Sequence, residues 1–249
     1  MKLHFLGVGE AFDPRNGNSS YLLETDRSTV LLDCGHTVPR DLFARLREPD
    51  QLSGILLSHF HGDHFFGLPF VLYRLHFDGR TAPLVVAGPS MLRERVQELC
   101  RLAYGDMLEK LAYPLELIEG DTPLSLNELD IQFARTDHPV PNNAMRIAVG
   151  DQAIFISGDG ALTEQSRSLL PGCALVVHEA YLLNESTKGH TTAAEVVAAV
   201  ESVGSVGELA LVHINRDERR SVVAARAELE GRAGCPLRIP EPGELWEST

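Results

Sequence analysis

The sequence predicts a mixed α/β fold in which two β-sheets pack face to face and helices cover their outer surfaces. Three observations lead to this prediction. Short apolar segments crowd the first third of the chain, a second group of them lies in its second half, and segments with helical spacing separate and follow these groups. With 249 residues and no repeat, low-complexity run or linker, the chain is expected to form one domain over residues 1–249.

The first third of the chain is expected to contain strands separated by glycine turns, which suggests a β-meander. Strands are predicted at residues 3–8, 20–24 and 29–34, a helix at 41–47, and a short buried strand at 54–58. A histidine-rich segment follows this last strand directly, so the candidate functional residues begin at the carboxyl end of a strand.

Helices and strands alternate in the rest of the chain. Predicted helices cover residues 65–77, 90–102, 191–203 and 217–230, and predicted strands cover residues 84–87, 131–136, 145–149, 153–157 and 208–214. Gly150 and Asp151 form the turn signal between two of these strands. The two strand-rich groups would supply the two sheets.

Charge and composition exclude several classes of protein. Twenty-two basic and thirty-five acidic side chains give a formal net charge of −13, which argues against a broad non-specific hold on nucleic acid. No stretch reaches the roughly 20 apolar residues of a membrane helix, and the start of the chain lacks the pattern of a signal peptide, so we expect a cytoplasmic protein with no membrane partner. The four widely spaced cysteines are expected to be buried thiols: Cys34, Cys100, Cys173 and Cys235.

Three of the ten histidines fall within six residues, in a segment that reads His-x-His-x-Asp-His. In an extended loop after a strand, His59 and His61 would project to one side, and Asp63 with His64 to the other. Two neighbouring metal sites could then share this loop. A polar loop without a ligand is the alternative, and it is the preferred interpretation for a lone histidine but not for this cluster.

Three isolated residues further along the chain are candidates for the remaining ligands. His138, Asp159 and His213 each stand where a predicted strand passes into a loop, and open α/β folds place their sites at such strand ends. Alone, each would be better explained as a loop-capping aspartate or as a buried histidine with a hydrogen-bond partner. Together with the histidine loop, they favour metal binding.

The order of these motifs resembles the metallo-β-lactamase superfamily, and in particular its ribonuclease Z and phosphodiesterase branch. The resemblance covers nearly the whole chain. It rests on the histidine loop and on segments 7–9, 15–20, 32–35, 67–68, 138–141, 157–159, 178–180, 189–192 and 211–213. It implies an αββα sandwich of two mixed sheets flanked by helices, with a dinuclear metal centre at one edge.

The resemblance also implies a set of ligands. One ion would be held by His59, His61 and His138, the other by Asp63, His64 and His213, and Asp159 would bridge the two. We expect two divalent ions, with zinc as the default, although imidazole and carboxylate ligands also suit manganese or iron. In the class B β-lactamases a cysteine tends to stand where this chain has the bridging aspartate, so antibiotic hydrolysis is not expected.

Such a pair of ions favours phosphodiester hydrolysis. Two ions roughly 3.5–4 Å apart lower the pKa of a bridging water, so that hydroxide attacks, and they clamp the attacking and leaving oxygens. The catalytic residues expected beside the ions are Asp63 and His190. His190 matches a histidine of the branch outside the ligand set and would protonate the leaving oxygen, and capping of the following helix is its alternative role.

Other residues near the motifs are expected to support the site or the core. Asp33 and Glu179 could orient ligand imidazoles, although an aspartate before a turn is often only a turn former. His178 is expected to be structural or to support a ligand. Apolar residues after the histidine loop are expected to pack in the core: Phe65, Phe66, Phe70 and Leu72.

The chain departs from the branch at three places. Only twenty residues separate His138 from Asp159, which leaves no room for the long arm that grips tRNA in the tRNA-processing members. Gly160 stands where the branch usually has threonine, which removes a hydroxyl near the ions. The pair Asn142-Asn143 replaces aromatic or glycine residues, so we expect an altered pocket rim.

We therefore expect a metal-dependent phosphodiesterase that cleaves a small or cyclic phosphodiester. A tRNA 3′-end endonuclease is the second hypothesis, and a lactone or thioester hydrolase of the same fold is the third. An inactive metal-binding subunit is the non-enzymatic alternative, which the complete ligand set disfavours. Nucleic acid stays open as a partner but is not favoured, and a homodimer would suit the branch. The physiological substrate, the native metal and the oligomeric state stay open.

Overall fold

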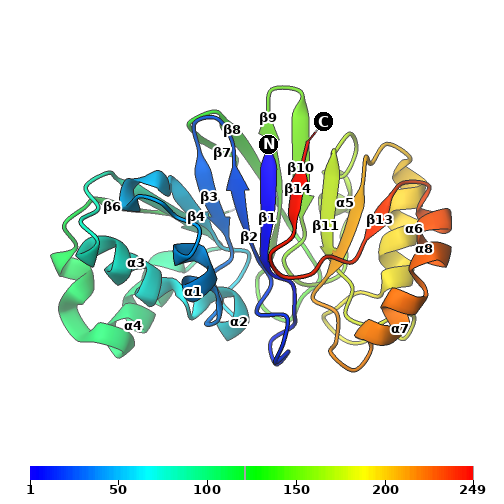
Figure 1. Cartoon of the computed structure of the whole chain (residues 1–249), viewed down its shortest axis with the longest axis horizontal. Coiled ribbons are helices and arrows are strands. Elements are labelled where there is room, and N and C mark those ends of the chain that lie inside the picture. The colour runs from blue at the N-terminus through cyan, green and yellow to red at the C-terminus, as the bar shows by residue number, and fades with distance from the viewer. Residues whose placement is uncertain (121, 249) are drawn as a thin grey trace.

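The computed structural model describes residues 1–120 and 122–248, and in this part of the chain two seven-stranded sheets pack face to face (Figure 1). The first sheet contains, in spatial order, β14 (Leu245–Glu247), β1 (Lys2–Gly7), β2 (Ser20–Glu24), β3 (Thr29–Leu32), β4 (Gly54–Leu56), β5 (Leu84–Gly88) and β6 (Leu115–Glu119). The strands from β14 to β3 pair antiparallel, and those from β3 to β6 pair parallel.

The second sheet has the same division into a parallel and an antiparallel half. Its spatial order is β13 (Leu237–Arg238), β12 (Leu209–Val212), β11 (Leu175–Glu179), β10 (Gln152–Ile156), β9 (Asn143–Val149), β8 (Leu129–Arg135) and β7 (Leu124–Leu126). The strands from β13 to β10 pair parallel, and those from β10 to β7 pair antiparallel. Parallel strands need crossover connections, and these carry most of the helices.

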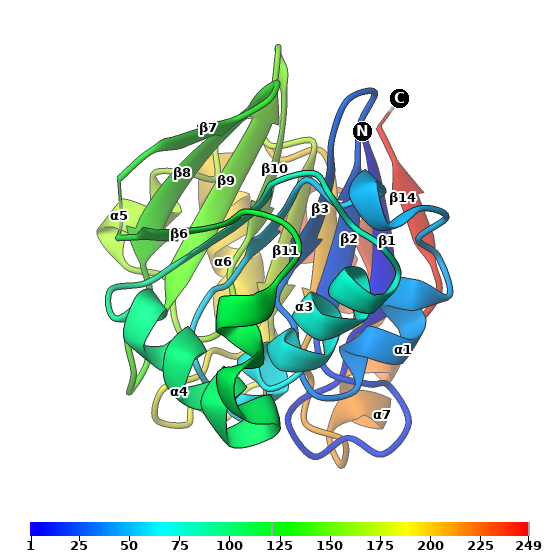
Figure 2. The ribbon, with the colours of Figure 1, turned by 90° about the vertical axis from the view of Figure 1, so that its left-hand side faces the viewer.

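Helices cover the outer face of each sheet (Figures 1 and 2). The first sheet carries α1 (Val38–Phe43), α2 (Gly62–Phe65), α3 (Leu68–Phe77) and α4 (Leu92–Tyr104), with short 3₁₀ segments η1 (Pro49–Gln51) and η2 (Gly105–Lys110). The second carries α5 (Glu164–Arg167), α6 (Ala193–Val203), α7 (Arg219–Ala224) and α8 (Arg226–Ala233). No helix among residues 1–120 and 122–248 has the length and apolar character needed to span a bilayer.

Alternation along the strands explains how each sheet is buried on both faces. On β10, Ile154 and Ile156 point into the layer between the sheets, while Phe155 points the other way, into the layer beneath α6 and α8. On the first sheet, Leu31 and Ile55 pack beneath the helices in the same way. Burial on both faces is why these strands read as continuous apolar runs in the sequence.

The strand directions place several strand ends at one edge of the sandwich. Strands β1, β3 and β4 run the same way in the first sheet, as do β8, β10, β11 and β12 in the second. The histidine loop follows β4, and His138, Asp159 and His213 follow β8, β10 and β12. The topology therefore brings together segments that are up to 150 residues apart.

The expected fold class is confirmed, and most predicted elements are present with shifted ends. The helix expected at 41–47 instead begins at Val38, because Pro39 is suited to the first turn of a helix. The helix expected at 65–77 is divided into α2 and α3, and Pro69 marks the new start. The helix expected at 217–230 is divided at Ala225 into α7 and α8.

Two expectations about burial need correction. Phe65 and Leu72 lie in the core as expected, but Phe66 and Phe70 are 51% and 50% exposed because they lie on the side of the α2–α3 segment that faces away from the sheet. The cysteines are free thiols; three are buried, and Cys235 is half-buried. Among residues 1–120 and 122–248, five strands were not predicted, since they are short or lack clear alternation: β6, β7, β11, β13 and β14.

Candidate metal centre

The seven candidate ligands lie together at the edge of the sandwich where the strands end. Their ligand atoms form two groups that could each hold a metal ion, with all atoms of a group within 4.8 Å of one another. The first group is His59, His61, His138 and Asp159, and the second is Asp63, His64 and His213. The grouping agrees with the division that the family resemblance implies.

The spacing within the groups suits ligands of a common ion. Two atoms bound about 2.1 Å from one tetrahedral ion lie about 3.4 Å apart. His138 Nε2 lies 3.3 Å from His61 Nδ1 in the first group. In the second group, Asp63 Oδ2 lies 3.3 Å from both His64 Nε2 and His213 Nε2.

Asp159 stands between the two groups. Its Oδ2 lies 3.8 Å from His59 Nε2. Its Oδ1 lies 3.4 Å from His64 Nε2 and 3.5 Å from His213 Nε2. The two carboxylate oxygens thus face different groups, which is the arrangement of a bridging ligand.

Several of these atoms are buried and have no hydrogen-bond partner among the described residues. They include His59 Nε2, His64 Nε2 and Asp159 Oδ1. A buried polar atom without a partner is costly, so groups of this kind call for a further interaction. Imidazole nitrogens and carboxylate oxygens are common donors to divalent transition metals, and the donor set therefore fits such ions.

One hydrogen-bond chain orients two of the imidazoles. His64 donates from Nδ1 to Asp33 Oδ2 at 2.8 Å. Ser58 donates to the same carboxylate from its backbone N at 2.6 Å and from Oγ at 2.7 Å, and its Oγ accepts from His59 Nδ1 at 3.0 Å. The Nε2 atoms of His59 and His64 are left facing Asp159. Asp33 thus contacts a candidate ligand imidazole, one of the two roles weighed from the sequence.

A second set of contacts holds Asp159 by its backbone. Asn142 is fully buried, and its Oδ1 accepts from Asp159 N at 3.1 Å. Thr136 donates from Oγ1 to the carbonyl oxygen of Asp159 at 2.6 Å and accepts from Asn142 Nδ2 at 2.8 Å. The expectation that Asn142-Asn143 alters the pocket rim is therefore wrong: both residues are buried, Asn142 because the loop after β8 turns inward beneath Asp159 and Asn143 because it begins β9.

The glycine after Asp159 has a steric explanation. Gly160 has φ +95°, and a Cβ there would lie 2.8 Å from Thr136 Oγ1 and 2.7 Å from the carbonyl oxygen of Asp137. A side chain at position 160 would therefore collide with Thr136, which holds Asp159, and with the backbone of Asp137. Although Gly160 brings no hydroxyl, Thr136 supplies one that binds the backbone of Asp159.

The loop segment after β4 is not extended throughout, contrary to expectation. Gly62–Phe65 forms the single helical turn α2, with His61 in extended conformation just before it. Asp63 and His64 therefore project from a helix, while His59 and His61 project from the extended part. The two pairs still reach the two groups of candidate ligands.

His190 lies beside the second group and is held by a buried carboxylate. Its Nδ1 donates to Glu179 Oε2 at 3.1 Å, and its ring stacks on Tyr181 with centroids 4.6 Å apart. Glu179 thus orients His190. Its Oε2 atom also lies 3.9 Å from Nδ1 of the candidate ligand His213. Asp159, His190 and His213 also form a third group that could hold a metal ion.

The electrostatics of the cluster favour cation binding. Burial lowers the pKa of His59, which keeps its imidazole neutral. Burial would raise the pKa of Asp63, but hydrogen bonds from His213 and His64 outweigh it and hold that pKa well below its usual range. The pKa of His213 is raised to about 9 against the effect of burial, mainly by Asp159. A metal ion would displace the proton that such a histidine holds.

His178 does not belong to the cluster. It is buried on β11, donates from Nδ1 to the carbonyl oxygen of Glu179 at 2.8 Å, and stacks against Phe155. Burial lowers the pKa of His178 to about 4, so the ring is neutral and structural.

A cavity of about 440 Å³ opens above the cluster. Asp63, Asp159 and His213 lie in its wall, together with His190 and residues that the sequence did not single out: Glu10, Ala11, Phe12, His36 and Tyr181. These residues come from loops, which have no periodic pattern to mark them. Ligand pockets of small molecules have about this volume.

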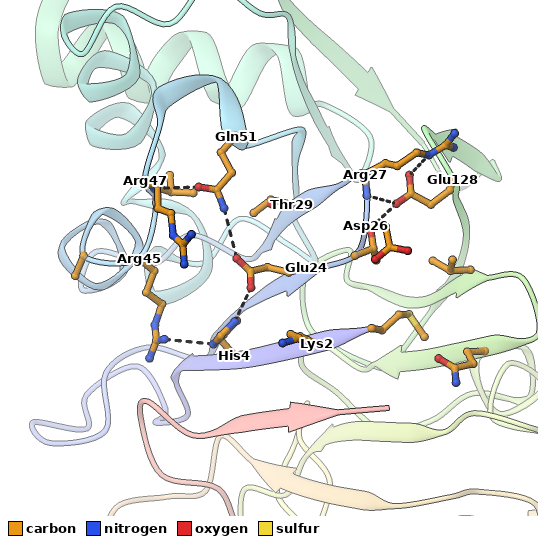
Figure 3. Close-up of a pocket in the computed structure, with 16 residues that line it drawn as sticks. Lys2, His4, Glu24, Asp26, Arg27, Thr29, Arg45, Arg47, Gln51 and Glu128 are labelled. Carbon is orange, nitrogen blue, oxygen red and sulfur yellow. Dashed lines mark hydrogen bonds and ion pairs between the residues drawn. The ribbon is translucent and has the colours of Figure 1, made fainter. Parts of the chain in front are cut away.

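A larger hollow of about 1060 Å³ lies at the opposite edge, where β1, β3, β8 and β10 begin (Figure 3). Several of its polar side chains pair with one another, as in His4 with Glu24 and Arg27 with Glu128. It contains none of the candidate ligands, so its size does not make it the functional site.

Comparison with known proteins places the chain among related sequences and folds. A family model described as anti-Pycsar protein Apyc1 matches residues 1–227. Ribonuclease BN of Escherichia coli O6:K15:H31 (strain 536 / UPEC) is 28% identical in an alignment 274 positions long, which covers 86% of this chain and 89% of that protein. Ribonuclease Z of Exiguobacterium sp. (strain ATCC BAA-1283 / AT1b) is 26% identical with the same coverage.

Solved structures give the same fold. The metallo-β-lactamase fold protein YhfI from Bacillus subtilis superposes with a TM-score of 0.82 at 24% identity, covering 99% of both chains. The short form of human tRNase Z gives a TM-score of 0.80 at 21% identity, also covering 99% of both chains. These matches show that the sandwich has the metallo-β-lactamase fold.

Proposed function

The chain belongs to the family of anti-Pycsar protein Apyc1, in the ribonuclease Z-like branch of the metallo-β-lactamase superfamily, and on this basis we propose that it hydrolyses a small or cyclic phosphodiester. Relatives of the chain are named as a ribonuclease and a diphosphatase, which are hydrolases, and the histidine and aspartate cluster fits a metal-dependent reaction of this kind.

The proposed site holds two divalent ions, with zinc as the expected metal. One ion would bind His59, His61 and His138, the other Asp63, His64 and His213. The observation that carries this assignment is the position of Asp159, whose two oxygens face the two groups. When bound, the ions supply a nucleophile derived from water and positive charge for the phosphoryl group.

His190 is the proposed proton donor to the leaving oxygen. Burial alone would lower the pKa of His190, but the hydrogen bond from Nδ1 to Glu179 and the charge of that carboxylate outweigh burial, so the pKa is raised. A protonated imidazole whose Nδ1 is held by Glu179 can deliver its other proton from Nε2. His190 lines the cavity, which is where that proton is needed.

The His190→Ala variant is expected to keep both ions while turnover falls by roughly 10²- to 10⁴-fold, the usual range for general acid catalysis. Steady-state kinetics and elemental analysis of the same preparation measure the two quantities. His4→Ala is the matched control, because His4 lies in the hollow at the opposite edge. Full activity would reject the acid role, and loss of an ion would instead assign His190 to the third group of potential ligands.

The Asp33→Asn variant is expected to bind metal about 10- to 100-fold more weakly, the usual effect of removing a group that orients a ligand. Asp33 accepts hydrogen bonds with both carboxylate oxygens, one from the backbone N of Ser58 and the other from His64 Nδ1. An asparagine keeps only one acceptor oxygen, so one of these bonds is lost. Titration against a competing chelator measures the affinity, with Asp151→Asn in an exposed turn as the control. Unchanged affinity would show that Asp33 does not position His64.

Three features support a small substrate. The segment between His138 and Asp159 consists mainly of β9, β10 and the turn at Gly150. It therefore contains no protruding arm that could hold a large RNA. The cavity of about 440 Å³ suits a small molecule. The net charge of −13 also disfavours a polyanion.

Cleavage of tRNA at its 3′ end is the second candidate function. It is favoured by the names of the curated relatives, ribonuclease BN and ribonuclease Z, which match 86% of the chain. A lactone or thioester substrate is a third candidate, because an activated water also attacks a carbonyl carbon.

A panel of substrates tests the proposed function. The metal-loaded protein is expected to hydrolyse bis(p-nitrophenyl) phosphate and to leave acyl-lactones intact and precursor tRNA uncut at low enzyme concentration. The Asp159→Ala variant, purified in parallel, controls for contaminating hydrolases. Turnover of lactones without phosphodiesters would move the protein to the lactonase class, and efficient processing of precursor tRNA would favour the endonuclease.

A further inference from the structure

The loop between β1 and β2 carries an aromatic ring to the mouth of the metal cavity. Phe12 is 78% exposed, yet it lines the same cavity as Asp63, Asp159 and His213. In Figure 1 this loop extends beyond the ends of the strands, on the side where α2 lies. The ligands are buried at the floor of the cavity, so an exposed ring at its rim would meet the part of a substrate that lies away from the ions.

A buried carboxylate holds the loop around this ring. Glu10 is 1% exposed and accepts from Phe12 N at 2.8 Å. Its other oxygen pairs with the guanidinium of Arg216, which follows β12. Asp13 N also donates to the carbonyl oxygen of Glu10 at 3.1 Å. The backbone of Phe12 is thus tied to both sheets, which fixes the point from which its side chain projects.

The next residues of the loop are fixed as well. Asp13 Oδ1 accepts from Arg15 N at 2.8 Å and from Asn16 N at 3.0 Å. Gly9 forms bridges to Asn18 and to Ile214. A loop whose backbone is held before binding loses less entropy when a ligand stacks on its side chain, which favours discrimination between ligands.

The ring also lies beside a fixed positive charge. The guanidinium carbon of Arg216 is 5.9 Å from the centroid of Phe12. Arg216 is 41% exposed, and its pairing with Glu10 keeps it at this distance. A planar group that stacks on Phe12 would therefore lie near both an aromatic face and a cation. This combination binds nucleobases of any type, because every base has a flat π-face.

We infer that Phe12 is a specificity-determining residue that stacks on a planar heteroaromatic group of the substrate, such as a nucleobase, while the phosphodiester lies at the metal cluster. This inference rests on the proposed phosphodiesterase function. It assigns the organic part of the substrate to the β1–β2 loop and the phosphate to the ligands beneath it.

The test compares two cyclic phosphodiesters that differ only in the base, adenosine 3′,5′-cyclic phosphate and the abasic 1-O-methylribose 3′,5′-cyclic phosphate. For the metal-loaded Phe12→Ala variant, kcat/KM on the nucleotide is expected to fall about 5- to 150-fold, the equivalent of ~1–3 kcal/mol of stacking, mainly through KM. On the abasic ester, kcat/KM of the same variant is expected to change less than about twofold, because this ester has no base to stack on Phe12.

Two further variants separate stacking from loss of volume or fold. Phe12→Tyr keeps an aromatic face and should retain the preference for the base, whereas Phe12→Leu should lose most of it. Phe77→Ala removes a similarly exposed phenyl from α3, outside the cavity, and should leave kcat/KM unchanged on both substrates. Equal losses on both esters in Phe12→Ala, or no loss on either, would overturn the inference.

A binding measurement keeps the two proposals distinguishable. Calorimetry with adenosine 5′-monophosphate and ribose 5-phosphate should show that Phe12→Ala weakens only the nucleotide, whether or not the protein turns over the cyclic esters. An unmodified protein that hydrolyses neither ester would count against the proposed function. Nucleotide binding that is unaffected by Phe12→Ala would overturn the role of Phe12 alone.

Discussion

The Asp159→Ala variant is expected to lose both metal ions and all measurable hydrolysis. Asp159 is the residue whose two carboxylate oxygens face both ligand groups, at 3.8 Å from His59 and at 3.4 and 3.5 Å from His64 and His213. Its removal takes one ligand and one negative charge from each ion at once. Without the shared carboxylate, the repulsion between the two cations would be less well compensated, and the neutral imidazoles that remain carry no charge to offset it. We therefore expect neither ion to be retained.

The variant should still fold, because the contacts that place Asp159 use its backbone. Asn142 accepts from its N–H and Thr136 donates to its carbonyl oxygen, and an alanine keeps both bonds. Elemental analysis and kinetics on bis(p-nitrophenyl) phosphate measure the outcome, with exposed Asp26→Ala as the control. A variant that retains one ion at full occupancy would contradict the bridging role.

The His61→Ala variant is expected to abolish turnover and to lower the metal content by one ion per chain. His61 Nδ1 lies 3.3 Å from His138 Nε2, so its loss leaves the first group with two imidazoles and the shared carboxylate. An ion that loses one of its four protein ligands is bound with lower affinity, so we expect the ion of the first group to be lost. Without one ion, the attacking and leaving oxygens lose their paired stabilisation.

Folding should not obscure this result. His61 is half-buried, and although it precedes α2, its side chain makes no capping bond to that helix. The melting temperature of the metal-free variant should therefore match that of the metal-free parent protein. His4→Ala again serves as the control for losing a histidine away from the cluster. A metal content equal to that of the parent would show that His61 is not a ligand.

The sequence was informative where chemistry and topology follow simple rules. Carboxyl ends of parallel strands share one edge of a sheet, so His138, Asp159 and His213 could be singled out at strand ends before any contact was known. The histidine loop was evident from its density alone. The structure then brings all seven side chains into two adjacent groups.

Supporting residues were harder to predict, because their roles depend on how loops fold back. Asn142 was expected at the rim, yet the loop after β8 buries it beneath Asp159. Phe12 and Glu10 lie in an irregular loop, where no periodicity marks a functional side chain. The exposure of Phe66 and Phe70 likewise depends on the break between α2 and α3, which shifts the faces of the two helices.

Some sequence predictions concern properties beyond these contacts. One domain over residues 1–249, a cytoplasmic location and a homodimeric state all stay predictions. Zinc as the native metal and the number of ions are part of the proposal. Its central claim is that two ions bind on either side of Asp159.

Crystals grown with zinc and measured at the zinc absorption edge test that claim most directly. The account predicts two anomalous peaks roughly 3.5–4 Å apart on either side of Asp159, one within reach of His59, His61 and His138 and the other of Asp63, His64 and His213. A single peak, or a peak bound by His190 in place of His64, would contradict it.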